Sequence, residues 1–267
     1  MSNLLSPNDT NDFFSNVGYK IIKPHKIMET PKNNETVFIT AGIQPSIEEY
    51  EKNKYLKALQ IFVMQPVLRT QYVNSIGEGY SLAFVNPTTA GINVSYKEYK
   101  RNLENWMNYF EFIGLDISKI TTEEKNYKSN KWGSFNLSGK SIFYYYNKPD
   151  TGKIEIGDST YYDKVEKNDS SENTIYSLSD TGFGLERLRW CLSDKSYYDL
   201  FSDSRDLSPG KKAFISAISL IAINGIVPSQ KSAGYRARSF SKKLVNMNNG
   251  RNLTVNEQKY LIECIKY

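Results

Sequence analysis

The sequence is poor in the residues that build disulfide frameworks, metal sites and histidine-based catalysis. Its 267 residues include two cysteines and one histidine, His25. Cys191 and Cys264 are distant in sequence and lie in apolar, helix-like surroundings, so we expect buried thiols and neither a disulfide nor a zinc site. A histidine-based catalytic dyad would have His25 as its one candidate. The sequence also lacks a signal-peptide pattern and an apolar run long enough to span a bilayer, which predicts a cytoplasmic protein with no membrane partner.

The chain is also not strongly charged. Its formal net charge of +5 permits contact with a polyanion without requiring it. Aromatic residues make up 13% of the sequence and include 20 tyrosines, so we expect a core and any pocket to be rich in rings. The length is sufficient for one large domain, or for a domain with an appendix.

The most informative stretch is residues 179–188, which read Ser-Asp-Thr-Gly-Phe-Gly-Leu-Glu-Arg-Leu. An alternating segment at 174–178 precedes it and an apolar helical run follows, which predicts a strand, a glycine turn and a helix. Gly182 and Gly184 would let a ligand approach the backbone where a Cβ would block it. Asp180, at the expected strand end, can pair with a cation, and Arg187 can face a phosphate or stack on a flat ring. Geometry alone leaves two interpretations open: a nucleotide site, or a glycine turn with a surface glutamate and arginine.

The remaining pattern alternates short strands and helices. We expect loose residues up to about 10, then a helix at 12–18, and strands at 19–22, 36–40, 60–69, 80–86, 142–146 and 153–158. Residues 96–113 predict an amphipathic helix whose stripe, including Trp106 and Phe110, is core. After a linker at 197–209, apolar residues 213–224 predict another helix. Gly139-Lys140-Ser141 lacks the upstream glycine of a phosphate-binding loop. Periodicity alone supports an α+β fold.

The string at 180–188 resembles motif 3 of class II aminoacyl-tRNA synthetases, in the form carried by alanyl-tRNA synthetase. Two strand-like segments joined by a polar loop, with Arg69 at the end of the first, resemble motif 2 of that class. The block at 225–238 is similar to the start of the alanyl enzymes' tRNA-binding helices, and the order of segments agrees from residue 12 to about 244. The resemblance implies a mixed, mainly antiparallel sheet flanked by helices. It also implies a catalytic domain at 1–205 and a short helical appendix at 206–267.

The resemblance also implies roles for individual residues. Arg69 would hold the α-phosphate of ATP, Arg187 would bind the ATP tail or adenine, and Phe84 would stack on the base. The glycines at 182 and 184 belong to the same ATP-binding motif. Asp180 would bind the ammonium group of an amino acid in a pocket walled by Trp132. Mg²⁺ would bridge the phosphates, with no protein ligand identified. Weak RNA contacts are assigned to the residues Gln230, Arg236 and Arg238.

The sequence departs from the alanyl pattern at several of these places. Tyr80-Ser81 replaces Arg-His, Asn86 replaces a glutamate, and Gln230 replaces the loop asparagine that is implicated in reading the acceptor stem. By this resemblance, we expect residues 206–267 to correspond only to the start of the tRNA-binding domain. Three functions therefore remain open. The first is an ATP-dependent ligase that activates an amino acid for a tRNA, a carrier protein or a small biosynthetic intermediate. The second is an inactive paralogue that binds a nucleotide, an amino acid or RNA. The third is a structural partner in a larger synthetase-like assembly.

Overall fold

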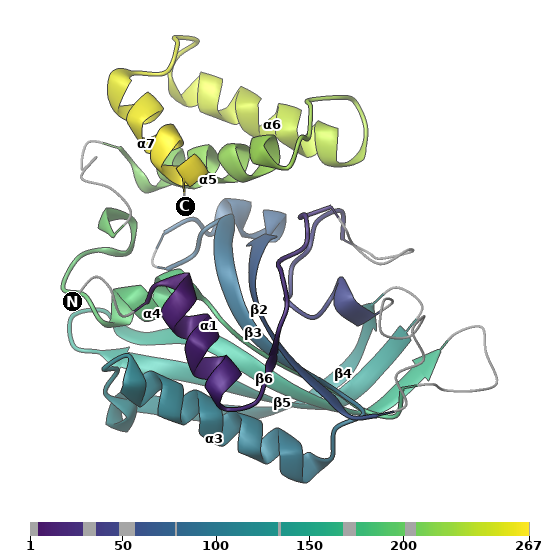
Figure 1. The fold of residues 1–267 in the computed structure, drawn as a ribbon. Helices are drawn as coiled ribbons and strands as arrows, with labels where there is room; N and C mark the ends of the chain where they lie inside the picture. Colours follow the sequence, from purple (N-terminus) through teal and green to yellow (C-terminus); the bar gives the residue numbers. More distant parts are fainter. Residues whose placement is uncertain are drawn as a thin grey trace.

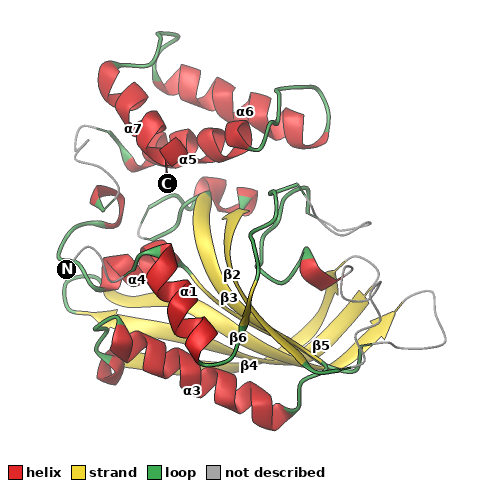
Figure 2. Ribbon diagram, in the orientation of Figure 1, coloured by secondary structure: helices red, strands yellow, loops and turns green. Residues whose placement is uncertain are grey.

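The computed structural model describes residues 5–28, 36–47, 57–77, 79–132, 135–167, 175–200 and 207–266. Within these ranges the chain forms one seven-stranded sheet in the order β1-β2-β3-β7-β6-β5-β4, with helices packed around it (Figures 1 and 2). β1 is parallel to β2, and every other neighbouring pair is antiparallel. The fold is therefore the mixed, mainly antiparallel α+β architecture expected from the sequence.

The elements have the following bounds. The strands are β1 Lys20–Ile21, β2 Leu59–Leu68, β3 Ala83–Ile92, β4 Ile120–Trp132, β5 Phe135–Lys148, β6 Gly152–Lys167 and β7 Leu178–Phe183. The helices are α1 Pro7–Asn16, α3 Tyr96–Phe112, α4 Leu185–Cys191, α5 Pro209–Ile223, α6 Ser232–Met247 and α7 Val255–Lys266. Short 3-10 turns lie at Thr70–Asn74, Ile117–Lys119 and Tyr197–Asp199. None of the helices in the described ranges is long and apolar enough to cross a membrane.

Helix α3 covers one face of the central strands, and its apolar stripe is core as predicted. Trp106 and Phe110 are buried there. Polar contacts between the helix and the sheet are buried as well: Trp106 Nε1 donates to Thr89 Oγ1 over 2.7 Å, and Asn102 Nδ2 donates to Thr181 Oγ1 over 2.8 Å. Because buried polar groups are costly when unpaired, these bonds fix α3 in one position on β3 and β7.

The N-terminal helix begins earlier than we expected. Instead of starting near residue 12, α1 starts at Pro7, after Ser6, whose Oγ accepts a hydrogen bond from Asp9 N over 3.1 Å. Serine before proline is a strong signal for a helix start, and the low apolar content of the first turn concealed it. The helix is attached to the sheet by Phe14, whose ring stacks on that of Phe62 with centroids 4.2 Å apart.

Several strand predictions were wrong in their limits, and the strand expected at 36–40 was wrong altogether. β7 does not end before the glycines; it continues to Phe183, so Asp180 and Gly182 lie inside a strand. β3 runs to Ile92, well beyond the expected end at residue 86, because it pairs with β2 and β7 on either side. Residues 36–40 form no strand. Their backbone makes isolated bonds instead, such as Leu68 N to Ile39 O over 3.1 Å, and Thr36 and Thr40 line a cavity described below.

Strands β5 and β6 are also longer than the strands predicted for this region. The predicted strands at 142–146 and 153–158 lie inside the hairpin of β5 and β6. Gly139-Lys140-Ser141 also lies within β5, and a Cβ on Gly139 would sit 2.0 Å from Tyr161 O of the neighbouring strand. The close pairing of these strands therefore accounts for a glycine at position 139, and no phosphate-binding role is needed to explain it. Of the polar loop expected at 166–173, residues 166 and 167 belong to β6, and the rest lies outside the described residues.

The C-terminal helices α5, α6 and α7 pack against one another beyond one end of the sheet (Figure 1). They confirm the predicted helix at 213–224 and the helical block that follows it. Lys212 attaches α5 to the preceding turn: its buried Nζ donates to Tyr198 O over 2.9 Å and pairs with Asp199 at 3.2 Å. The expected linker therefore begins as a packed turn. The predicted domain boundary, between residues 205 and 206, lies outside the described residues.

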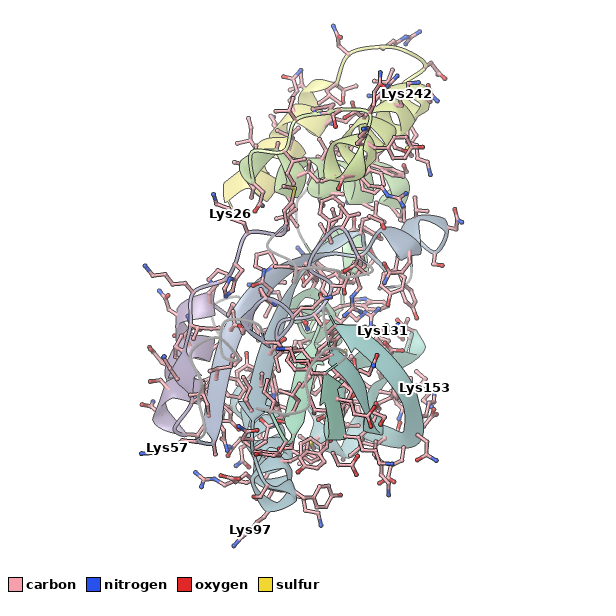
Figure 3. All side chains as sticks on the ribbon, turned by 90° about the vertical axis from the view of Figure 1, so that its right-hand side faces the viewer. Lys26, Lys57, Lys97, Lys131, Lys153 and Lys242 are labelled. Carbon is pink, nitrogen blue, oxygen red and sulfur yellow. The ribbon has the colours of Figure 1, made fainter. Side chains whose placement is uncertain are left out.

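Most of the positive charge is spread over the surface. Figure 3 shows labelled lysines projecting from the sheet, from the region of α3 (Lys97) and from α6 (Lys242). Lys148 and Lys212 are exceptions, since both are buried: Lys148 Nζ donates to Ser193 O, and Lys212 pairs with Asp199. The mild net charge therefore does not mark a single binding surface.

Candidate functional site

A cavity of about 280 Å³ lies on the face of the sheet opposite α3. Side chains alternate between the two faces of a strand, so Thr181 bonds α3 while its neighbours Asp180 and Gly182 line the cavity. On β6 the same alternation places Asp158 and Thr160 in the cavity wall. The cavity is thus built on the middle of the sheet, where strand pairing holds each side chain in place.

The register of β6 and β7 brings two carboxylates together. Asp158 pairs with Gly182, and Thr160 pairs with Asp180, so the two aspartates are diagonal neighbours on one face. Such neighbours are about 7–8 Å apart, within reach of each other's side chains and of one small ligand. Gly182 keeps the space open, since a Cβ there would lie 2.8 Å from Asn86 Nδ2.

The two carboxyl groups have raised pKa values. Burial is the main cause at Asp180, the charge of Asp158 adds to it, and the pKa reaches about 8 although Arg69 lowers it. Burial also raises the pKa of Asp158 to about 6, against the opposing charges of Arg69 and Arg187. At neutral pH such a pair retains about one proton. Positive charge supplied by a ligand would favour ionisation of the pair.

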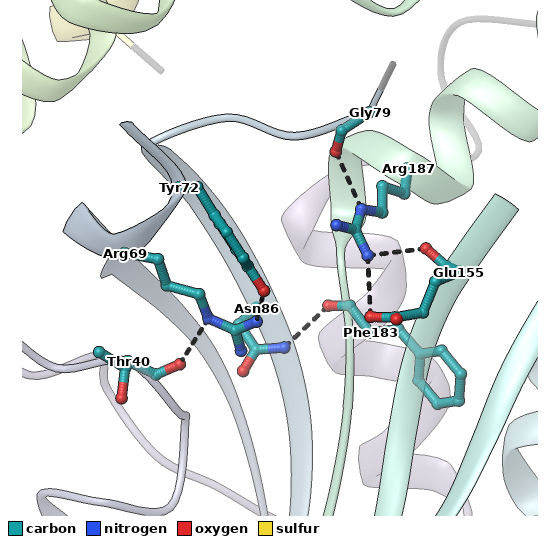
Figure 4. A network of polar contacts seen from close by, with 8 residues as sticks. All are labelled: Thr40, Arg69, Tyr72, Gly79, Asn86, Glu155, Phe183 and Arg187. Atoms are coloured by element: carbon teal, nitrogen blue, oxygen red, sulfur yellow. Dashed lines mark hydrogen bonds and ion pairs between the residues drawn. The ribbon is translucent and has the colours of Figure 1, made fainter. Parts of the chain in front are cut away.

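Arg69 lies at the end of β2 and faces the cavity (Figure 4). Its Nε donates to Thr40 O over 3.1 Å, and its Nη1 donates to the hydroxyl of Tyr72 over 3.3 Å. The guanidinium lies 5.0 Å from the centroid of the Phe84 ring. These contacts hold a permanent positive charge at one end of the cavity, with Nη2 available to an anionic group on a ligand.

Trp132 and Lys131 contribute to the wall of the same cavity from the end of β4. Trp132 is buried, and its ring packs edge-on against that of Tyr162 at 5.6 Å. The described segment 36–47 closes another side, where Gln44 Oε1 accepts a hydrogen bond from Thr40 N over 2.9 Å. The structure therefore brings Trp132, Asp180, Gly182 and Arg69, four of the residues singled out in the sequence, to one cavity.

Arg187, on the first turn of α4, lies in a neighbouring pocket of about 10 Å³ that it shares with Phe84 and Gly184. Its Nε donates to Gly79 O over 2.9 Å, and its Nη1 donates to Glu155 O over 2.7 Å and lies 3.4 Å from the Glu155 carboxylate. The same guanidinium sits 4.8 Å from the centroid of the Tyr80 ring. Arg187 is thus near Arg69 (Figure 4) but is engaged by its own chain.

Two site residues were not identified from the sequence. Asp158 was given no role; its alternation with Thr160 and Tyr162 is the signal that could have placed it on the cavity face. Glu186 was considered only as a surface residue, yet it is buried. Its carboxylate accepts two contacts from Val85 N, at 3.0 and 3.1 Å, and burial raises its pKa to about 7. Glu186 therefore fastens α4 to β3.

The residues assigned to RNA contacts lie elsewhere. Gln230 is exposed in the loop before α6, and Arg236 and Arg238 are exposed on α6. None of the three lines the cavity. Within the described ranges no cluster of three histidine, cysteine or acidic side chains could hold a metal ion, and Cys191 and Cys264 are free thiols. Cys191 is buried as predicted, whereas Cys264 is only partly buried.

Comparison with known proteins found no matching family model and no matching curated protein. The solved structures similar to this chain include apo histidyl-tRNA synthetase from S. aureus, with a TM-score of 0.48 and 8% identity over 70% of this chain and 67% of that one. Another is PylSc, a pyrrolysyl tRNA synthetase from Desulfitobacterium hafniense, with a TM-score of 0.44 and 13% identity over 70% and 68%. Both are tRNA synthetases, and neither is an alanyl enzyme. At these scores neither similarity identifies a substrate, so any inference of function rests on the motifs and the cavity.

Proposed function

We propose that this chain activates an amino acid with ATP, forming an aminoacyl-adenylate and releasing pyrophosphate. The observation that carries the proposal is the charge arrangement of the cavity. The carboxylates of Asp158 and Asp180 are suited to an ammonium group, while the guanidinium of Arg69 is suited to a carboxylate and a phosphate. A zwitterionic amino acid has these complementary charges.

In the proposed reaction an oxygen of the amino-acid carboxylate attacks the α-phosphorus of ATP. The bond to the β-phosphate oxygen breaks, and pyrophosphate leaves. Asp180 binds the α-ammonium, Trp132 forms a wall of the pocket, and Arg69 stabilises the charge that builds on the α-phosphate. The enzyme forms no covalent intermediate in this scheme. Mg²⁺ would neutralise the ATP phosphates; since the described residues offer no three-ligand cluster, the nucleotide itself would supply most of its ligands.

For the nucleotide we propose the neighbouring pocket with Phe84, Gly184 and Arg187. Its volume of about 10 Å³ does not admit a purine. Binding of the base therefore requires Arg187 to leave Gly79 O, its hydrogen-bond partner at 2.9 Å, so that the guanidinium can turn to the nucleotide. The Phe84 ring, which also contacts Arg69, would connect the base to the amino-acid cavity.

The test is ATP–pyrophosphate exchange with the full chain, screened over all amino acids. We expect at least one amino acid to give exchange, and Asp180→Asn to reduce it by more than about tenfold, because the neutral amide cannot replace the charge that pairs with the ammonium. Asp163→Asn makes the same chemical change at an exposed position of β6 and should leave exchange unchanged. Exchange that survives Asp180→Asn in full would contradict the role of this residue.

A second candidate function is supported by the contacts of Arg187. Its two donating nitrogens already bond Gly79 and Glu155, and the pocket beside it is nearly closed. In a paralogue that binds an amino acid, a nucleotide or RNA without catalysis, Arg187 would keep these bonds and the pocket would stay closed. ATP binding measured by calorimetry, together with no exchange for any amino acid, would select this function over activation.

The acceptor of the activated amino acid is also a proposal. A tRNA, a carrier protein or a small intermediate would each fit an adenylate-forming enzyme. Gln230 stands where alanyl enzymes carry asparagine, and Arg236 and Arg238 are exposed, so we expect RNA contact that is weak and falls steeply with salt. Aminoacylation of transcribed tRNAs tests this: efficient charging of alanine tRNA, lost when its acceptor base pair is altered, would establish a true tRNA ligase.

A further inference from the structure

The cavity holds more acidic groups than one α-ammonium needs. Asp158 and Asp180 both line it, from adjacent strands and on the same face. Neither carboxylate accepts a hydrogen bond from any other residue in the described part of the chain; the interactions that act on them are electrostatic. Two carboxylates without donors in a partly enclosed site indicate that a ligand supplies the donors.

The neighbouring cations do not balance this pair. Lys131 lines the cavity but is exposed to solvent, and Arg187 is paired with Glu155 at 3.4 Å. The charge of Arg69 lowers the pKa of both aspartates, but in the proposed reaction its guanidinium pairs with the substrate carboxylate and the phosphate. A ligand with one ammonium would therefore leave one carboxylate of the pair without a positive partner.

We propose that the substrate is a short diamino acid whose α-ammonium binds Asp180 and whose side-chain ammonium binds Asp158; this identity rests on the amino-acid activation proposed above. Asp158 and Asp180 are diagonal neighbours, a position in which residues lie about 7–8 Å apart. Their carboxylates can approach each other more closely than this, which suits two nitrogens a few bonds apart. The other lining groups are mainly polar, among them Thr40, Gln44 and Thr160. They provide oxygens for the remaining ammonium protons, which an alkyl side chain would leave unused.

Binding of two ammonium groups has a consequence that binding of one does not. Burial holds the pKa of Asp180 at about 8 and that of Asp158 at about 6, so the free pair retains about one proton at pH 7. The charged groups that face this pair are Arg69, Arg187, Glu155 and Lys131. A diamino acid ionises both carboxyls and releases that proton, whereas a monoamino acid leaves one carboxyl protonated.

The test compares amino acids matched in carbon number. Titration calorimetry of the full chain would measure 2,4-diaminobutyrate against 2-aminobutyrate, and ornithine against norvaline, at pH 7 in buffers of different ionisation enthalpy. We expect one diamino acid to bind at least about tenfold more tightly than its partner and to release about one proton. Asp158→Asn should remove this preference, while Asp163→Asn, at an exposed position of the same strand, should keep it.

Several results would overturn the inference: equal affinity within both matched pairs, binding of the diamino acids without proton release, or a preference that survives Asp158→Asn. Pyrophosphate exchange with the same compounds separates the two proposals. Exchange with monoamino acids alone refutes the diamino substrate and leaves activation intact. Selective diamino-acid binding without exchange supports the inference about the site and refutes activation.

Discussion

Replacing Asp180 by asparagine should make the protein more stable, by an amount that depends on pH. Folding raises the pKa of this carboxyl from 3.8 to about 8. Between these values the folded chain binds more protons at this site than the unfolded chain, so stability falls as pH rises through the window. Below pH 3.8 both states are protonated at this site and the penalty is absent.

The size of the effect follows from the pKa difference. Each pH unit between the unfolded and folded values is worth about 1.4 kcal/mol, and roughly three units separate 3.8 from pH 7, which gives about 4 kcal/mol. Asp180 faces a cavity that water can reach, so we halve this figure to about 2 kcal/mol. For a chain of this size that corresponds to about 4–8 °C in melting temperature.

The assay is urea unfolding of the wild type and of Asp180→Asn at pH 4, 6 and 8. We expect the stability difference to be small at pH 4 and to favour the variant increasingly toward pH 8. Asp158→Asn provides a comparison, because the folded pKa of that carboxyl is about 6 and its smaller effect should level off at lower pH. A stability difference that does not change with pH, or a variant less stable at pH 8, would refute the reasoning about the two cavity carboxyls.

Other changes test separate parts of the site and its support. Gly182→Ala should weaken amino-acid binding by at least about tenfold in calorimetry, because its Cβ would lie 2.8 Å from Asn86 Nδ2 and push that side chain into the cavity; unchanged affinity would refute this. Trp106→Phe should lower the free energy of unfolding by about 1–3 kcal/mol, since it leaves the buried Thr89 hydroxyl without its 2.7 Å partner; a loss within error in urea unfolding would contradict it. Arg69→Ala should reduce pyrophosphate exchange by at least about 100-fold with little change in melting temperature, and an equally large loss of stability would mean that the arginine is structural.

The sequence predicted the elements that have a strong local pattern. The helix at 96–113 was placed to within one residue because its buried stripe repeats with helical period and Gly114, with φ of +82°, follows its end. The limits of the strands were less predictable. β3 and β7 extend past their expected ends because each has partners on both sides, and such pairing depends on residues distant in sequence.

The candidate site was predictable only where a motif marked it. Asp180, Gly182 and Arg187 were singled out from one short string, yet their placement differs: the first two lie inside a strand, and the third begins a helix. Asp158 belongs to no recognised string. Its importance comes from the register that sets it beside Asp180, and register cannot be read from one strand alone.

The alternation of β7 explains how a site with unpaired charge is held in place. The side chains of Thr181 and Phe183 point to α3, where Thr181 accepts a bond from Asn102 and the Phe183 ring lies 4.5 Å from that of Trp106. Asp180 and Gly182, which alternate with them along β7, face the cavity on the other side of the sheet. The contacts that stabilise β7 lie on the face that packs against α3. The Asp180 carboxylate on the other face can therefore remain without a donor among the described residues, while strand pairing fixes its backbone. The penalty of burying its charge can then be relieved by an ammonium group on a ligand, which makes the same feature a source of binding energy and of instability in the free protein.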